Sequence, residues 1–312
     1  MITIFLGFAL FASAFTVNKL ILGHLSPVFF VGLRTLPAGL IIMVTHAWRT
    51  RKPQLCTLRK DWLFLLLIGA LTTFLPSVLK NYGLKYLVSS KSALLGSLDP
   101  FVTAIYAYFL WKEKLRLRQI VGMFIGFSGV AVLIYSTSAL EETLGVFMGI
   151  FSWPELAALA SMVISRFGWI LAQGLLKSER YQPSEINGII MVTGGTMAFI
   201  TSFFWNQCDF CAIPLTWGFL GLYTYSVVMG NILGYTIYTY LLKHYNMTLI
   251  SLCGLSVPLF THLFGPIIGE PLSLNFFISL ALVTLGMTLF MVDPRKLPAH
   301  FFAYREARRQ RK

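Results

Sequence analysis

Three charged residues stand well inside long apolar runs, where their side chains have the right chemistry to bind a charged ligand: Asp99, Arg34 and Arg166. A carboxylate in such a run is costly unless it is paired or hydrated, which makes it a functional candidate by default. Guanidinium groups are natural bidentate partners of carboxylates and phosphates. Arg34 therefore holds an acidic ligand group or neutralises Asp99. Arg166 is too far from the ends of its run to reach water easily.

Small and polar residues recur around Asp99 at steps of three or four, a spacing that places them on one face of a helix. They are Ser92, Gly96, Asp99, Thr103 and Tyr106. Such a face suits the wall of a cavity, so we expect Ser92, Thr103 and Tyr106 to bind substrate beside the carboxylate. A structural ion pair, or a protonated acid bonded to a hydroxyl, is the alternative.

A second polar group lies further along the chain. It comprises Asn231, Tyr235 and Tyr238, then Thr248, Ser251 and Thr261, with His262 adjacent. Tyrosines on one helix face stack a planar ring or hold a cation; interfacial belts and interhelical hydrogen bonds are the competing interpretation. The predicted substrate site includes Asn231, Tyr235, Tyr238 and Ser251. A lone histidine favours a helix–helix hydrogen bond over proton transfer, although a relay stays open.

Three lysines, Lys80, Lys85 and Lys91, lie beside the ends of two apolar runs. They either draw an anionic group toward the site by their local potential or extend to the membrane surface at little cost. Lys85 has a counterpart in the internal repeat described below, which favours a structural role. That leaves Lys80 and Lys91 as candidates, and we expect Arg34 or Lys91 to hold the anionic end of a ligand.

The remaining reactive residues have simpler explanations. The run SWPE at 152–155 is typical of a capping box at a helix start, so Glu155 is expected to be structural. Cys208 and Cys211 alone make a weak metal site; a disulfide between them stays open. No phosphate loop, dinucleotide motif, nucleophile elbow or paired-carboxylate motif occurs in a plausible context. We expect no metal, no cofactor and no enzymatic activity.

Composition shows which elements must position these residues. The 312 residues are 56% hydrophobic and 12% charged, about half the charged share of a soluble domain, and their mean hydropathy is +0.73. An apolar run of about 20 residues spans a bilayer as a helix. The sequence predicts an all-α membrane protein with ten transmembrane helices, near 2–22, 28–47, 62–84, 90–110, 118–136, 153–176, 186–205, 215–241, 248–268 and 273–292.

Basic residues distinguish the two sides of the predicted bundle. A net charge of +13 would suggest nucleic acid in a soluble protein, but 19 of the 25 lysines and arginines fall in alternate connections and in the tail 293–312. The positive-inside rule then predicts that both termini are cytoplasmic. We expect no nucleic-acid partner, and we expect the basic tail to contact anionic membrane lipid.

The two halves of the chain are related. The segment YGLKYLVSSKSALLGSLDP (82–100) matches YLLKHYNMTLISLCGLSVP (240–258), and the match superimposes Lys85 on Lys243, Gly96 on Gly254 and Pro100 on Pro258. Five helices are an odd number, so the copies enter the membrane from opposite sides. Inverted repeats place a transporter's substrate site near the midplane. We expect Gly96, Pro100, Gly254 and Pro258 to act as hinges, because they allow local bending.

These segments resemble the paired EamA-type repeats of drug/metabolite transporters. The resemblance rests on FASAFTVNKLILGHLSPVFFVGLR, on the run from LKYLVSSKSALLGSLDP to FSGVAVLI, and on its second copy ending in GEPLSLNFFISLALVTLGMTLFMV. It covers about residues 2–293. It implies ten helices, alternating access and a solute-sized central cavity. Known family members carry amino acids, sugar phosphates, nucleotide sugars or S-adenosylmethionine.

The sequence therefore predicts a secondary transporter of a small amphipathic metabolite. A zwitterion with a ring and a cation suits the residues best, so S-adenosylmethionine, exchanged for its demethylated product, is the expected substrate. An amino acid or another family metabolite is the alternative, and a lipid flippase or a channel comes after it. We expect a first repeat at 1–136, a periplasmic connection at 137–152 and a second repeat at 153–292. The compact form and the resemblance favour a bacterial inner membrane and a monomer or homodimer.

Overall fold

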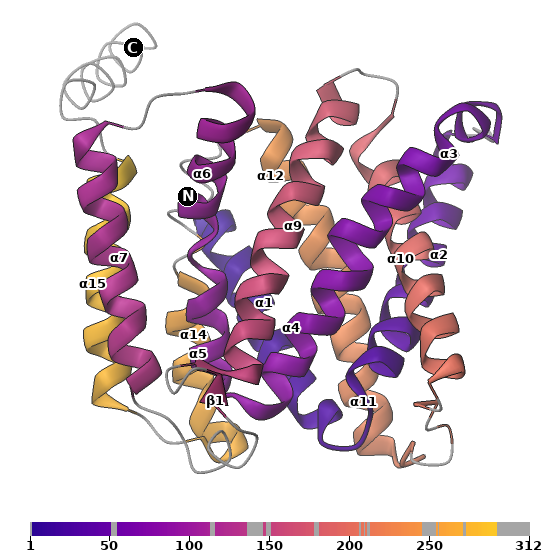
Figure 1. Ribbon diagram of the computed structural model, residues 1–312. Helices are drawn as coiled ribbons and strands as arrows, with labels where there is room; N and C mark the ends of the chain where they lie inside the picture. Colours follow the sequence, from indigo (N-terminus) through magenta and orange to yellow (C-terminus); the bar gives the residue numbers. More distant parts are fainter. Residues whose placement is uncertain are drawn as a thin grey trace, which may run out of the picture.

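A computed structural model describes most of the chain as helices that run up and down through one bundle (Figure 1). The described residues are 2–50, 55–112, 116–135, 146–147, 151–177, 181–205, 207–208, 210, 213–244, 254, 256–270 and 273–291.

The helices fall on the predicted apolar runs. Their bounds are α1 Ile2–Leu22, α2 Pro27–Thr50, α3 Leu55–Gly69, α4 Leu75–Tyr86, α5 Ser89–Gly96, α6 Asp99–Trp111, α7 Leu117–Tyr135, α9 Trp153–Lys177, α10 Pro183–Phe204, α11 Trp217–Tyr225, α12 Tyr235–His244, α14 Ser256–Phe264 and α15 Leu274–Met291. Short segments with π or 3₁₀ geometry lie between some of them: η1 Ala70–Phe74, η3 Ser226–Gly234 and η4 Gly265–Ile268. A two-residue antiparallel pair, β1 Val146–Phe147 with β2 Phe151–Ser152, precedes α9.

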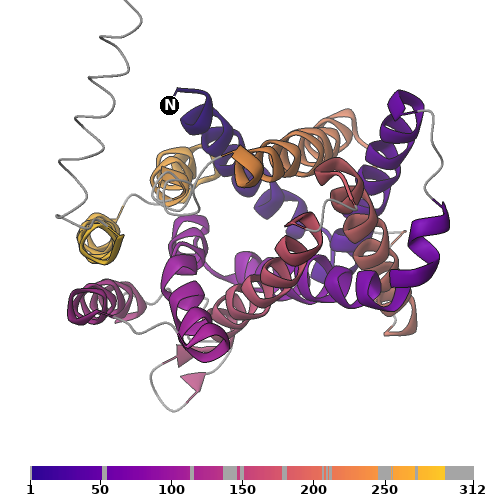
Figure 2. The same ribbon diagram turned by 90° about the horizontal axis from the view of Figure 1, so that it is seen from above.

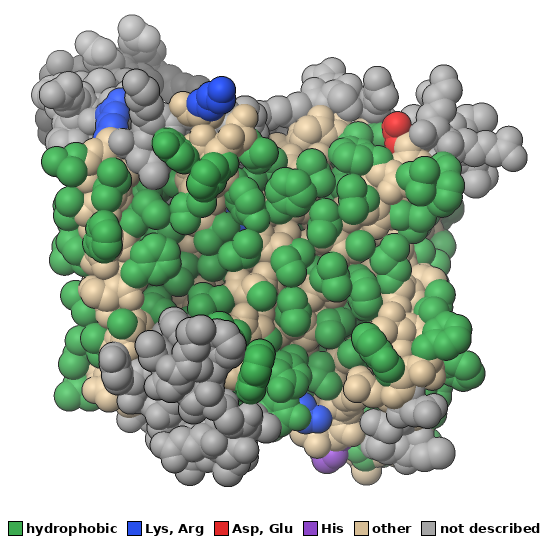
Figure 3. Space-filling model, in the orientation of Figure 1, with side chains coloured by type: hydrophobic (Ala, Val, Ile, Leu, Met, Phe, Trp, Pro, Cys, Tyr) green, Lys and Arg blue, Asp and Glu red, His purple; other side chains and the backbone are tan. Residues whose placement is uncertain are grey.

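The apolar surface marks an integral, multi-pass, all-α membrane protein. Five segments are long and apolar enough to cross a membrane: Pro27–Trp48, Asp61–Tyr86, Ser89–Leu110, Trp153–Leu176 and Pro183–Phe204. Shorter apolar helices are Gly7–Leu22, Leu117–Val132, Ser256–Ile268 and Leu274–Phe290. Figure 3 shows hydrophobic side chains over the middle of one face, with most of the visible charged side chains near its upper and lower ends. An apolar band of this kind is what lipid tails require.

Three of the predicted helices are interrupted where the sequence analysis expected continuous ones. The run 90–110 consists of α5 and α6, which are separated at Ser97 and Leu98 because Pro100 has no N–H to donate to the preceding turn. The run 62–84 passes through η1 just before Pro76, and 215–241 passes through η3. In 248–268, the described helix begins at Ser256. The single polar face drawn from Ser92 to Tyr106 was therefore wrong, because it crosses the break between α5 and α6.

Helices from the two halves of the chain pack against each other in pairs. α2 contacts α10, α4 contacts α9, α1 contacts α14 and η3, and α7 contacts α15. In both views α7 and α15 lie side by side at one edge of the bundle (Figure 1, Figure 2). Glycine allows this pair to approach closely, since a Cβ on Gly286 would come within 2.5 Å of the Gly122 carbonyl oxygen and of the Gly126 nitrogen.

Adding a methyl group at Gly286 tests this close packing. We expect Gly286→Ala to lower the free energy of unfolding by about 1–3 kcal/mol, because the new Cβ meets backbone atoms that cannot move away independently. The measurement is the thermal unfolding midpoint in detergent. Gly174→Ala is the matched control: its Cβ meets nothing within 4 Å, so the better helix propensity of alanine leaves the midpoint unchanged or slightly higher. A Gly286→Ala midpoint no lower than that of Gly174→Ala contradicts the packing.

Candidate functional site

A cavity of about 240 Å³ lies among α1, α4, α5, α6, α9, α12 and α14. Its charged lining residues are Lys80, Asp99 and Arg166. Its aromatic lining residues are Phe8, Phe11, Phe15, Trp169, Tyr235 and Tyr238. Small residues complete the wall: Ser92, Ala93, Gly96, Ser97, Pro100, Ser165, Gly254 and Val257. The cavity therefore combines charges of both signs with flat rings.

Asp99 and Arg166 form an ion pair at this cavity. The Nη2 of Arg166 donates to the Oδ2 of Asp99, and the same guanidinium hydrogen-bonds Tyr238. Asp99 is the first residue of α6, where the helix dipole favours a carboxylate. The Arg166 side chain is 6% exposed and the Asp99 side chain 38%. The guanidinium is thus held in protein while the carboxylate faces open space.

Lys80 brings a second cation to the same cavity from α4. Its Nζ lies 4.8 Å from the centroid of the Phe15 ring, and its side chain is exposed to the cavity rather than buried. Among the described residues it forms no ion pair. An ammonium group in this position is available to a ligand carboxylate. The sequence left Lys80 and Lys91 as candidate ligand contacts, and of these two Lys80 lines the cavity.

Arg34 lies outside the cavity lining and does not pair with Asp99. Its residue is 8% exposed, its Cζ sits 5.0 Å from the Phe30 ring centroid, and its Nε has no hydrogen-bond partner within the described structure. Asn231 lies beside it and donates from Nδ2 to the Arg34 carbonyl oxygen at 3.4 Å. Of the two roles that the sequence left open for Arg34, the neutralisation of Asp99 is excluded, because Arg166 takes that position.

Aromatic rings form one wall of the site. Trp169 stacks on Tyr235 with centroids 6.4 Å apart and an interplanar angle of 26°, and it meets Tyr238 edge-on at 5.6 Å. Phe11 contacts Tyr235 from α1, with centroids 6.0 Å apart. Both tyrosines are predicted from the sequence, whereas Trp169 is not, although it is three residues after Arg166 and therefore on the same helix face.

The α1 phenylalanines were missed as well. Phe8, Phe11 and Phe15 follow one another at helical spacing. That stripe is equally typical of a lipid-facing or core surface, so only the fold shows that it lines a cavity.

Lys91 is in a different environment from the one predicted. Its Nζ lies 2.6 Å from Glu155 Oε1, with side chains 4% and 0% exposed, and it is not part of the cavity lining. The backbone N–H of Ser152 donates to Glu155 Oε2 at 2.7 Å, which confirms the capping role of Glu155. A ligand carboxylate has no access to this buried pair, so Lys91 is not a ligand contact in this conformation.

The other predicted site residues are divided between the cavity and its surroundings. Ser92, Gly96, Pro100 and Gly254 line it, whereas Pro258 does not. Thr103 donates to the Asp99 carbonyl oxygen within its own helix at 2.9 Å, and Tyr106 donates to the Val163 carbonyl oxygen at 3.1 Å. Ser251 lies outside the described residues.

His262 and Cys208 do not line the cavity. His262 Nδ1 lies 3.1 Å from Ser90 Oγ, the interhelical bond that the sequence favoured. Cys208 carries a free thiol, and Cys211 lies outside the described residues. Within the described ranges no group of three or more metal-ligating side chains occurs.

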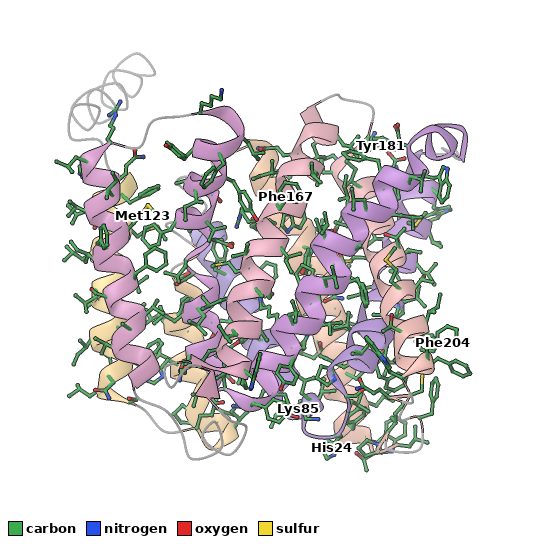
Figure 4. The ribbon with its side chains drawn as sticks, viewed as in Figure 1. His24, Lys85, Met123, Phe167, Tyr181 and Phe204 are labelled. Atoms are coloured by element: carbon green, nitrogen blue, oxygen red, sulfur yellow. The ribbon has the colours of Figure 1, made fainter. Side chains whose placement is uncertain are left out.

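A polar network lies at one end of the bundle, the end at which Figure 4 labels Lys85 and His24. Glu270, which follows η4, accepts hydrogen bonds from the Ser89 N–H at 2.9 and 3.1 Å and from the Ser89 hydroxyl at 2.9 Å. Lys19 lies 2.5 Å from the same carboxylate and also donates to the Leu87 carbonyl oxygen at 2.6 Å. Ser89 begins α5, so the carboxylate caps a helix start. The network joins α1, α5 and the chain after η4.

The sequence pattern of the EamA-like transporter family matches residues 1–135 and again residues 152–292. These two matches cover nearly the whole chain. The protein belongs to the EamA-like transporter family. The lining residues of the charged, ring-lined cavity come from both matched stretches.

Several relatives within this group are similar along most of their length. A protein of Chlamydia trachomatis serovar L2, named S-adenosylmethionine/S-adenosylhomocysteine transporter, is 26% identical over 92% of this chain and 87% of its own. A protein of Chlamydia muridarum with the same name is 26% identical over 92% of this chain and 89% of its own. The uncharacterised transporter YyaM of Bacillus subtilis is 26% identical over 90% of each chain.

A solved crystal structure shares the fold of this EamA-like transporter. It superimposes with a TM-score of 0.64 over 95% of this chain and 97% of its own, at 18% sequence identity. At that identity the likeness concerns the fold alone.

Replacing each member of the Asp99–Arg166 pair tests the asymmetry of their exposure. Asp99→Asn leaves a buried guanidinium without a counter-charge, at a cost of up to about 3–5 kcal/mol. Arg166→Gln leaves a carboxylate that the open cavity solvates. We expect the unfolding midpoint in detergent to fall further for Asp99→Asn. Equal midpoints, or a lower one for Arg166→Gln, would contradict this geometry.

Proposed function

We propose that the protein is a secondary transporter that exchanges S-adenosylmethionine for S-adenosylhomocysteine by alternating access. The observation that carries the proposal is that one cavity contains the Lys80 ammonium, the partly exposed Asp99 carboxylate and a wall of aromatic rings. The names of the chlamydial relatives support the choice of substrate.

Each part of the ligand has a complementary group in the cavity. The Lys80 ammonium binds the substrate carboxylate, and the free oxygen of Asp99 accepts from the substrate amine. Trp169 and Tyr235 stack the adenine ring, because aromatic side chains and bases attract through their flat faces. The cavity of about 240 Å³ is below the roughly 300 Å³ at which ligand pockets usually begin, so Lys80 and the rings move apart as a nucleoside enters.

The alternating-access part of the proposal assumes ten spans in two inverted repeats, 1–136 and 153–292, joined by 137–152. The packing pairs support this assumption, because two related repeats should contact each other symmetrically. The second span packs on the seventh (α2 on α10) and the fifth on the tenth (α7 on α15). The contact of the third span with the sixth (α4 with α9) is matched by that of the eighth with the first (η3 with α1). The two π segments, η1 and η3, lie in the third and eighth spans and also correspond. π segments recur at functional sites.

The alternation of basic residues along the sequence supports the placement of both termini in the cytoplasm, and the bacterial relatives support a bacterial inner membrane. In that orientation the network of Lys19, Ser89 and Glu270 is on the outer side. The cavity is then reached from the cytoplasm while this network keeps the outer side closed. Breaking it is part of the outward-opening step.

Exchange in proteoliposomes tests the proposed function. We expect labelled S-adenosylmethionine to enter vesicles loaded with S-adenosylhomocysteine saturably, and faster than it enters empty vesicles. Trp169→Ala removes the ring stacked on Tyr235 and is expected to reduce uptake about tenfold, since base stacking is worth about 1–3 kcal/mol. Trp217→Ala is the matched control, because Trp217 is 90% exposed on α11 and does not line the cavity.

Two results would contradict the proposed function. If an amino acid competes for uptake and S-adenosylmethionine does not, the substrate is wrong although a transporter remains. If no solute moves under any gradient but fluorescent lipid crosses the bilayer, a lipid flippase replaces the proposal. Equal loss of uptake in Trp169→Ala and Trp217→Ala would remove the cavity from the mechanism.

Neutralising Glu270 tests the outer closure. In a variant whose four native cysteines are replaced by serine and whose cavity residue Ala93 is replaced by cysteine, we expect Glu270→Gln to increase labelling by an impermeant maleimide added outside several-fold. The physical reason is that Glu270→Gln removes the negative charge that pairs with Lys19, which weakens the outer closure. Glu185→Gln is the control, because Glu185 caps the start of α10 with a 3.3 Å bond to the Gln182 N–H. An unchanged labelling rate in Glu270→Gln argues against a gate.

A further inference from the structure

Among the residues that the structure describes, the interior of the bundle holds more positive than negative charge. Three acids have basic partners in the described structure: Glu270 with Lys19, Glu155 with Lys91, and Asp99 with Arg166. Asp61 and Glu185, the other described acids, lie near the opposite end, where they bond to Tyr181 and to the Gln182 N–H respectively.

Arg34 and Lys80 are the interior cations that no described acid pairs. Each lies instead over an aromatic ring, Arg34 at 5.0 Å from the Phe30 centroid and Lys80 at 4.8 Å from the Phe15 centroid. The charge of Lys80 interacts with the Asp99 carboxylate, which Arg166 already pairs, and then with Arg34. In a membrane interior such charges are weakly screened and act over long distances. The potential at the cavity is therefore positive.

The two proposed ligands differ by one charge at one atom. S-adenosylmethionine carries a methyl group on sulfur, which makes the sulfur a sulfonium cation, whereas S-adenosylhomocysteine has an uncharged thioether there. Carboxylate, amine and adenosine are common to both. A positive potential leaves these shared contacts alike and opposes only the sulfonium.

Cation–π attraction works in the opposite direction, because aromatic rings favour a sulfonium. Here the rings of Phe15 and Phe30 already face cations of the protein, and Tyr238 is hydrogen-bonded by Arg166. Trp169 and Tyr235 are engaged by the adenine in the proposed pose, which leaves Phe8 and Phe11 of α1 as the other lining rings, and a phenylalanine ring attracts a cation less than a tryptophan ring does. The excess charge therefore dominates.

We propose that Lys80 is a specificity-determining residue, which with Arg34 behind it makes the cavity prefer the neutral thioether to the sulfonium. This inference rests on the proposed function and adds to it which of the two exchanged ligands binds more tightly. The inward-facing carrier binds its product more tightly than its substrate.

Equilibrium competition on the purified protein tests this preference. Labelled S-adenosylhomocysteine is displaced by each unlabelled ligand, and the ratio of Kd for S-adenosylmethionine to Kd for S-adenosylhomocysteine is the readout. We expect a ratio of about ten in the wild type, the size expected of one charge at nanometre range in protein. Lys80→Gln weakens both ligands through the carboxylate, but this shared loss cancels in the ratio. The ratio therefore falls toward one, whereas Lys80→Arg retains it.

Lys85→Gln is the control, because Lys85 donates to the Leu25 carbonyl oxygen away from the cavity, and it should leave the ratio unchanged. A wild-type ratio at or below one overturns the inference without any variant, as does an unchanged ratio in a folded Lys80→Gln protein. If Lys80→Gln does not fold, the inference is judged by the other two measurements. A wild-type Kd ratio of about ten that is retained in Lys80→Arg supports it, and a ratio at or below one overturns it. If neither ligand binds the wild type, the proposed function falls and the inference falls with it.

Discussion

A charged group enclosed by helices and lipid must be neutralised by its immediate surroundings, and the arrangement of this protein follows from that requirement. The described ion pairs join different segments of the chain: Lys19 of α1 to Glu270 after η4, Lys91 of α5 to Glu155 of α9, and Asp99 of α6 to Arg166 of α9. Two of the pairs hold the bundle in register. The third is open on one side, which gives the cavity a carboxylate with a fixed partner.

The backbone is subject to the same requirement, because unpaired peptide groups are costly in lipid. The break between α5 and α6 is tolerated where it lines a cavity, and it makes Asp99 a helix start rather than a residue in the middle of a helix. A side-chain hydroxyl also satisfies a carbonyl group at η1, where Thr72 donates to the Ile68 carbonyl oxygen at 2.6 Å. Among the described irregular segments, the break between α5 and α6 lines the cavity, whereas η1, η3 and η4 contribute no lining residue.

The first helix connects the cavity with the closed end. Phe11 and Phe15 face the cavity, and Lys19, one turn further along, belongs to the closing network. A ligand that displaces Lys80 from the Phe15 ring acts on the same rigid helix that carries Lys19. In the proposed cycle, this helix transmits occupancy of the cavity to the outer closure without a separate moving domain.

The sequence by itself determined the membrane class, the positions of the helices and the family resemblance, because these depend on composition and on patterns repeated over many residues. It also indicated Asp99, Arg166, Tyr235 and Tyr238 as interior polar groups, because a charge or a polar stripe inside an apolar run is visible without neighbours. Only the tertiary structure decided the partners. Lys91 and Lys80 look alike in sequence, yet one is paired with Glu155 and the other faces the cavity. Pairing depends on the distance between residues that are far apart in the chain. Helical periodicity shows on which face of its helix a residue lies, but not which other helix that face contacts.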